Sequence, residues 1–117
     1  MSKENELEFL EAHKHGTGYE TNFAVKKFLE LPSAKQEALH AKIMSDDKQK
    51  RAEAAETLLD FILKNLSEMG KFVHEGIDTW LIWPNDHEPK AIYLLLYFRH
   101  HLQKNPDGTF SISPIEL

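Results

Sequence analysis

The sequence predicts a mainly helical α+β protein: a compact bundle of about five helices around a long central helix, with a small antiparallel β element in the C-terminal half. Segment 45–70 carries apolar residues at helical spacing over its whole length. Segment 71–83 is instead rich in β-branched and aromatic residues, and 109–113 alternates polar and apolar residues. These observations place helices around a spine at 45–70 and a small sheet after it.

Length and composition predict a single globular domain, 1–117. Hydrophobic residues make up 41% and charged residues 28% of the 117 residues, which is a globular balance long enough to bury a core. The chain has no cysteine, which excludes disulfides, thiolate metal sites and a cysteine nucleophile. Its longest apolar run, 91–98, is far shorter than the roughly 20 residues that span a bilayer. We therefore expect a soluble, cytoplasmic protein without a membrane segment.

Start and stop signals divide the chain into five expected helices, over 3–14, 21–31, 34–44, 46–69 and 90–104. Gly16-Thr17-Gly18 is expected to end the first, because glycine adopts positive φ without a steric penalty. Pro32 ends the second, since the residue before proline avoids the helical region. Ser33 and Gln36 have the spacing of a capping box and are expected to start the third.

The expected spine, 46–69, has one apolar and one acidic side. Its apolar stripe consists of Ala52, Ala55, Leu59, Ile62, Leu66 and Met69, and it is widened by Leu58, Phe61 and Leu63. Ser45 is expected to cap its first turn, and Gly70 to end it in the left-handed conformation. The stripe is wider than a two-stranded coiled coil needs, so the helix is interpreted as the core of one bundle.

The C-terminal third predicts a small sheet and one more helix. Glu75-Gly76 is a candidate hairpin turn within 71–83, and the strand at 109–113 is expected to pair with 77–83. Segment 91–98 is apolar on all sides and could form a helix or a buried strand. The basic residues that follow it favour a helix, because cations complement the negative end of the helix dipole.

Seven histidines are the only sign of metal or acid–base chemistry: His13, His15, His40, His74, His87, His100 and His101. None is four residues from another on a helix, the spacing that puts two imidazoles on one face. The sequence also lacks a GxSxG motif and a phosphate-binding glycine loop. We therefore expect no metal and no cofactor, and a non-catalytic protein is favoured over an enzyme.

The first functional hypothesis is a small protein-binding module, such as a regulator, inhibitor, immunity protein or assembly adaptor. Segment 52–88 holds eight acidic and two basic residues within a formal net charge of −5, which would suit a basic partner. The C-terminal third is rich in aromatic residues, which favour interfaces. The predicted partner-binding residues are Glu53, Glu56, Asp60, Glu68, Trp80 and Trp83.

Two alternatives are retained beside this hypothesis. Segment 21–51 holds seven basic and four acidic residues, and its two helices resemble a helix-turn-helix with Lys35 and Lys42 on the second. A nucleic-acid-binding regulator is therefore the second hypothesis, although the acidic remainder of the chain disfavours it. A histidine-dependent metal enzyme is the third. The large apolar load on a short chain also predicts a homodimer.

Overall fold

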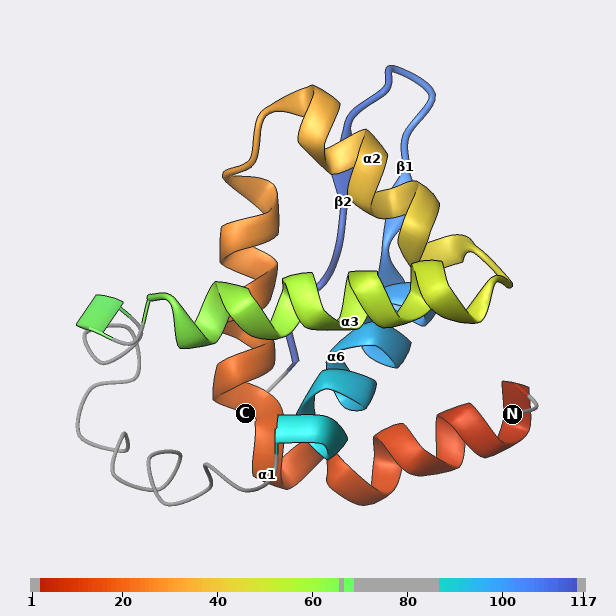
Figure 1. Ribbon diagram of the computed structural model, residues 1–117, viewed down its shortest axis with the longest axis vertical. Coiled ribbons are helices and arrows are strands. Elements are labelled where there is room, and N and C mark those ends of the chain that lie inside the picture. Colours follow the sequence, from red (N-terminus) through yellow and green to blue (C-terminus); the bar gives the residue numbers. More distant parts are fainter. Residues whose placement is uncertain (1–2, 66, 69–86, 116–117) are drawn as a thin grey trace.

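The computed structural model describes residues 3–65, 67–68 and 87–115 and confirms the mainly helical class (Figure 1). Its elements are helices α1 (Lys3–Leu29), α2 (Ser33–Met44), α3 (Lys48–Leu63) and α6 (His87–His101), and strands β1 (Gln103–Lys104) and β2 (Phe110–Ser111). The two strands form a small antiparallel sheet in the C-terminal half, as predicted. In the described part of the chain no helix is both long and apolar enough to cross a membrane.

Helix α1 corrects the first prediction. Gly16-Thr17-Gly18 does not end a helix, and the expected helices 3–14 and 21–31 form one helix that ends at Leu29. Figure 1 shows that α1 bends sharply midway, with its first half across the base of the view and its second half rising behind α3. Glycine inside a helix costs only about 1 kcal/mol relative to alanine, which tertiary packing can outweigh. Glycine pairs are a common site of helix bends rather than breaks.

Helix α6 is the most deeply buried element and decides between helix and strand for 91–98. Six consecutive residues, Tyr93 to Phe98, are buried. They are covered from several sides, because α6 contacts α1, α2 and α3. A segment that is apolar all round is central in either conformation, and the basic end residues Arg99, His100 and His101 mark this one as a helix.

Helix α3 crosses in front of α6 and of the second half of α1 (Figure 1). It is shorter than the predicted 46–69, because it ends at Leu63. Its N-cap is Asp47 rather than Ser45: the Asp47 carboxylate accepts from the Gln49 N–H at 2.8 Å. Asn65 takes part in its C-terminal end by donating to the Phe61 carbonyl.

The buried side of α3 is rotated from the predicted stripe. Its buried residues are Ala54, Leu58 and Ile62, whereas Ala52 is exposed. Of the predicted stripe, Ala55 and Leu59 are partly buried, Ile62 is buried, and Leu66 and Met69 lie outside the described side chains. Regular spacing fixes which residues share a side, but the neighbouring helices decide which side is covered most.

The sheet is a hairpin that follows α6 directly. Gln103 pairs with Ser111 and Lys104 with Phe110, so the predicted helix 90–104 gives way to a strand in its last residues. The sequence Asn105-Pro106-Asp107-Gly108 predicts a turn by its composition, and the structure confirms it, with Gly108 at φ 90°. The predicted pairing of 109–113 with 77–83, and the Glu75-Gly76 turn, lie outside the described residues.

Candidate binding cleft between α2 and α3

The four predicted acidic residues do not form one open acidic face. Glu53 pairs with Lys42 of α2 at 2.9 Å, and Asp60 pairs with Lys64 at 3.4 Å. Glu68 pairs with Lys26 at 3.5 Å and also with Lys27, both on α1. Glu56 is exposed and has no ion pair among the described residues. Trp80 and Trp83 lie outside the described residues.

These contacts change the acidity of the carboxylates. Hydrogen bonding to Lys42 lowers the pKa of Glu53, and hydrogen bonding to Lys27 lowers the pKa of Glu68. Both side chains are partly exposed to solvent, so each ion pair contributes little to stability. Glu53 and Glu68 therefore meet lysines of neighbouring helices, and a basic partner would have to compete with those lysines.

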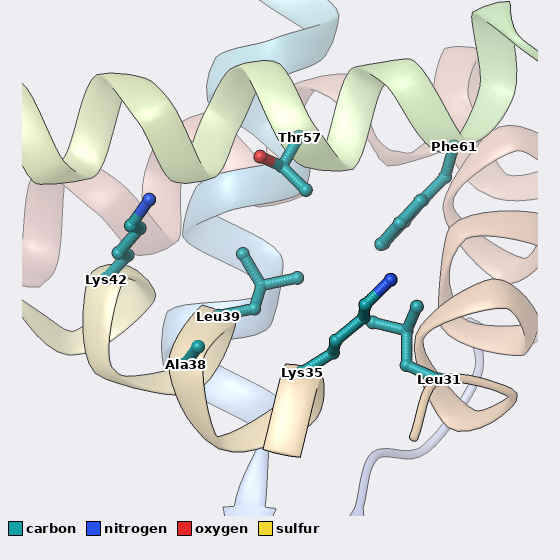
Figure 2. Close-up of a pocket in the computed structure, with 7 residues that line it drawn as sticks. All are labelled: Leu31, Lys35, Ala38, Leu39, Lys42, Thr57 and Phe61. Atoms are coloured by element: carbon teal, nitrogen blue, oxygen red, sulfur yellow. The ribbon is translucent and has the colours of Figure 1, made fainter. Parts of the chain in front are cut away.

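The structure instead forms a cleft of about 330 Å³ between α2 and α3. It is lined by Leu31, Lys35, Ala38, Leu39, Lys42, Thr57 and Phe61. Figure 2 shows Leu39 pointing up from α2 toward Thr57, while Phe61 reaches down from α3 on the side where Leu31 stands. Apolar side chains thus line the hollow, and Leu31 and Phe61 are only partly buried.

The sequence builds this cleft by alternating large and small residues on α2. Leu39 and Ile43 are buried and attach the helix to the core. Ala38, beside Leu39, ends in a single methyl group and is exposed. Because Ala38 lines the cleft with only a methyl group, a larger residue at this position would fill part of the space.

Hydrogen bonds fix α2 at both ends of the cleft. At its start the N-cap residue is Pro32 and no side chain caps the helix, so the predicted capping box of Ser33 and Gln36 is wrong. Gln36 instead donates to the carbonyls of Phe28 and Leu29 at the end of α1, at 3.2 and 3.4 Å. Proline has no side-chain oxygen with which to cap the helix. Gln36 instead binds carbonyls at the end of α1 that have no partner within that helix.

At the other end of α2, the Arg99 guanidinium donates to the carbonyls of Ile43 and Ser45 at 2.7 and 2.9 Å. This contact satisfies carbonyls that the helix end leaves without a partner. Lys42 adds its ion pair to Glu53 of α3. The cleft is therefore a fixed feature, held at both ends by side chains that are not part of its apolar lining.

The charges of the cleft are unbalanced. Its lining contains two lysines and no acidic residue. Lys42 is neutralised by Glu53, whereas Lys35 has no ion pair within the described ranges. The Thr57 hydroxyl donates to the Glu53 carbonyl at 2.9 Å and is thus already occupied. One uncompensated ammonium group stands beside an apolar hollow.

Apart from the cleft, a cluster of polar side chains connects α1, α3 and α6. His100 Nε2 lies 2.9 Å from the buried Glu6 carboxylate, whose other oxygen lies 3.7 Å from Arg51. A polar cavity of about 130 Å³ next to it is lined by His100, His101, Gln103, Ser111, Ile112 and Ser113. In the described part of the chain, no three His, Asp or Glu residues form a group that could hold a metal.

Two further histidines, His40 and His101, pack against aromatic rings. His101 stacks on Tyr97 with ring centroids 4.3 Å apart, and His40 lies 5.0 Å from the Phe110 ring. Burial lowers the pKa of both imidazoles. Neutral rings in such contacts behave as packing groups at neutral pH.

The cleft was not predicted from sequence, although its parts were. Leu31, Leu39 and Phe61 are apolar residues of three segments that the sequence predicts as separate helices, 21–31, 34–44 and 46–69. Lys35 and Lys42 were singled out only as the basic face of the helix-turn-helix-like segment. The small residue Ala38 next to the large residue Leu39 is the sequence feature that could indicate a cleft. It becomes informative only when the relative positions of α2 and α3 are known.

Comparison with known proteins gives no guide to this site: no family model, no curated protein and no solved structure matches the chain. The functional conclusion therefore depends on the residues of the site.

Proposed function

We propose that this chain is a non-catalytic protein-binding module and that the α2–α3 cleft is its contact surface. The observation that carries the proposal is the apolar hollow itself, with Leu31 and Phe61 partly uncovered around it. Binding energy at protein interfaces is concentrated where a large anchor side chain enters a preformed, well-packed hollow. A cleft of about 330 Å³ is at the lower end of the size range of ligand sites, which suits a single anchor group.

The rigidity of the cleft supports the same function. Gln36 and Arg99 hold the two ends of α2 through carbonyls of the main chain. A surface fixed before binding loses little conformational freedom when a partner docks. Of the acidic residues that the sequence suggested as contacts, Glu53 pairs with the lining residue Lys42, and Glu56 is exposed without an ion pair among the described residues.

The test is affinity capture from a native lysate with three baits: the wild type, Ala38→Gln and Ala41→Gln. Both alanines are exposed on α2, but only Ala38 lines the cleft. We expect a stoichiometric partner with the wild type and with Ala41→Gln, and at least a fivefold reduction with Ala38→Gln. Equal recovery with all three baits would contradict the assignment of the cleft, and repeated failure to recover any partner would contradict a binding function.

A further inference from the structure

We infer that the α2–α3 cleft recognises an apolar anchor side chain of a partner protein that has a carboxylate next to it. This inference rests on the proposed function and specifies the chemistry of the partner. It reverses the expectation of a basic partner that the acidic composition of 52–88 suggested.

The lining of the cleft favours an apolar guest. Leu31, Leu39 and Phe61 present hydrocarbon groups, and the Thr57 hydroxyl is occupied by the Glu53 carbonyl. The lining side chains thus leave no neutral hydrogen-bond donor for a guest, and the Thr57 oxygen keeps only its capacity to accept. An aliphatic or aromatic side chain gains by leaving water here, whereas a polar one would lose its hydrogen bonds.

Lys35 favours a carboxylate next to the apolar group of the guest. Figure 2 shows its ammonium group directed up from α2, toward the space between Leu31 and Phe61. It has no ion pair among the described residues, and the cleft lining offers no carboxylate. Lys35 also lies in the first turn of α2, whose cap residue provides no side-chain acceptor. An anion beside the anchor would meet both the ammonium and the positive end of the helix.

Nearby acids do not cancel this charge. Glu37, two residues along α2, pairs with Lys104 of the hairpin at 2.6 Å. Glu53 is paired with Lys42 on the opposite side of the cleft, and Glu30 is paired with Lys26 and Lys27 of α1. These three carboxylates already have cations of their own, whereas Lys35 is the lysine of the lining that has no carboxylate partner among the described residues.

The anchor is assigned to a protein rather than to a free amphipathic acid because of the size of the cleft and the apolar surface beside it. The cleft covers about one side chain, and a small ligand would gain little more than the transfer of that group. A partner protein can add contacts outside the cleft. Leu29, two residues before Leu31, is 45% exposed and extends the apolar surface there.

The experiment uses octanoate as the probe of an apolar group with a carboxylate, and octylammonium as its oppositely charged counterpart. Each is titrated into ¹⁵N-labelled full-length protein, and amide shifts of Leu39 and Phe61 report binding in the cleft. The variant is Lys35→Glu. Its matched control is Lys48→Glu, because Lys48 is also exposed and has no ion pair among the described residues but lies outside the cleft.

We expect octanoate to shift the cleft amides with a millimolar dissociation constant and to bind at least tenfold more tightly than octylammonium. Lys35→Glu should reverse this preference, and Lys48→Glu should leave it unchanged. Equal affinities, or a preference that survives Lys35→Glu, would overturn the carboxylate assignment, while the proposed function would still be decided by the Ala38→Gln capture. No shift with either probe would overturn the apolar anchor. A micromolar constant for octanoate would overturn the assignment to a protein in favour of a free fatty-acid ligand.

Discussion

Two regions of this molecule differ in whether their polar side chains have hydrogen-bond or ion-pair partners. Where α1, α6 and the C-terminal segment meet, side chains bind main-chain groups or each other. Asn22 both donates to the Ile115 carbonyl and accepts from its N–H, at 3.0 and 2.7 Å, and the Tyr97 hydroxyl donates to the Ser113 carbonyl. In the α2–α3 cleft, Lys35 has no such partner within the described residues, and apolar groups remain partly uncovered.

The difference separates structural contacts from a surface available for binding. Satisfied polar groups between distant segments stabilise one arrangement of the chain. An uncovered apolar hollow with an unpaired cation contributes nothing comparable to the folded state. Variants in the first region should therefore lower stability, whereas variants in the cleft should leave stability unchanged and alter binding.

The largest effect is expected for Arg99→Ala. This change leaves the carbonyls of Ile43 and Ser45 without their donor and should lower the free energy of unfolding by about 2 kcal/mol. Urea denaturation followed by circular dichroism measures it. Arg99→Lys, which keeps one charged donor, should lose less. A loss below about 0.5 kcal/mol for the alanine variant would mean that the contact does not hold α2.

A smaller loss is expected for Asn22→Ala. It removes two hydrogen bonds to Ile115 and should cost about 1–2 kcal/mol. Hydrogen exchange gives a local check, because the Ile115 amide should exchange much faster in the variant while amides buried in α6 change only with global stability. Unchanged protection at Ile115 would show that Asn22 does not attach the C-terminal segment.

A third effect is the pH dependence of stability between pH 7.5 and 5. Burial lowers the pKa of His40 and His101, so the unfolded chain, with an ordinary histidine pKa of about 6.5, binds protons more readily than the folded one. Stability should therefore fall as the pH drops through this window. The lowered pKa of Glu53 and of Glu68 acts only at more acidic pH.

The double variant His40→Gln/His101→Gln is the control for this effect. Neither substituted side chain titrates, so urea denaturation of the variant at pH 7.5 and 5 should show a smaller difference than in the wild type. The same difference in both proteins would assign the pH dependence to other groups.

The smallest effects are expected in and around the cleft. Lys35→Glu and Glu53→Gln should each change the free energy of unfolding by no more than about 0.5–1 kcal/mol, because exposed ion pairs and surface charges contribute little. Urea denaturation beside Lys48→Glu checks this. A loss as large as that of Arg99→Ala would place Lys35 among the structural contacts and remove the contrast between the two regions.

Sequence alone predicted those features that depend on neighbours along the chain. The helix at 91–98 followed from its basic end, and the turn at 105–108 from its proline and glycine. The predicted break at Gly16-Thr17-Gly18 was wrong, because a local conformational preference gave way to packing. The buried side of α3 was only partly predicted: Leu58 and Ile62 are buried as expected, but Ala54 was not part of the predicted stripe and is buried because α6 and the other helices pack around that side.

The candidate site was beyond sequence reasoning for the same physical reason. An acidic side of α3 can be deduced from periodicity, but the lysines that neutralise Glu53 and Glu68 come from α2 and α1. The cleft needs Ala38 and Leu39 of α2 to face Thr57 and Phe61 of α3, a relation set by how the two helices pack. Patterns within one helix contain no information about that relation.

Site-specific photo-crosslinking tests the central claim most directly. Benzoylphenylalanine is placed at position 38, in the cleft, or at position 41, elsewhere on the exposed surface of α2, and the protein is irradiated in its native cells. We predict one discrete crosslinked product of higher mass from position 38 and none from position 41. No discrete product from position 38, or the same product from both positions, would contradict the assignment of the α2–α3 cleft as the binding surface.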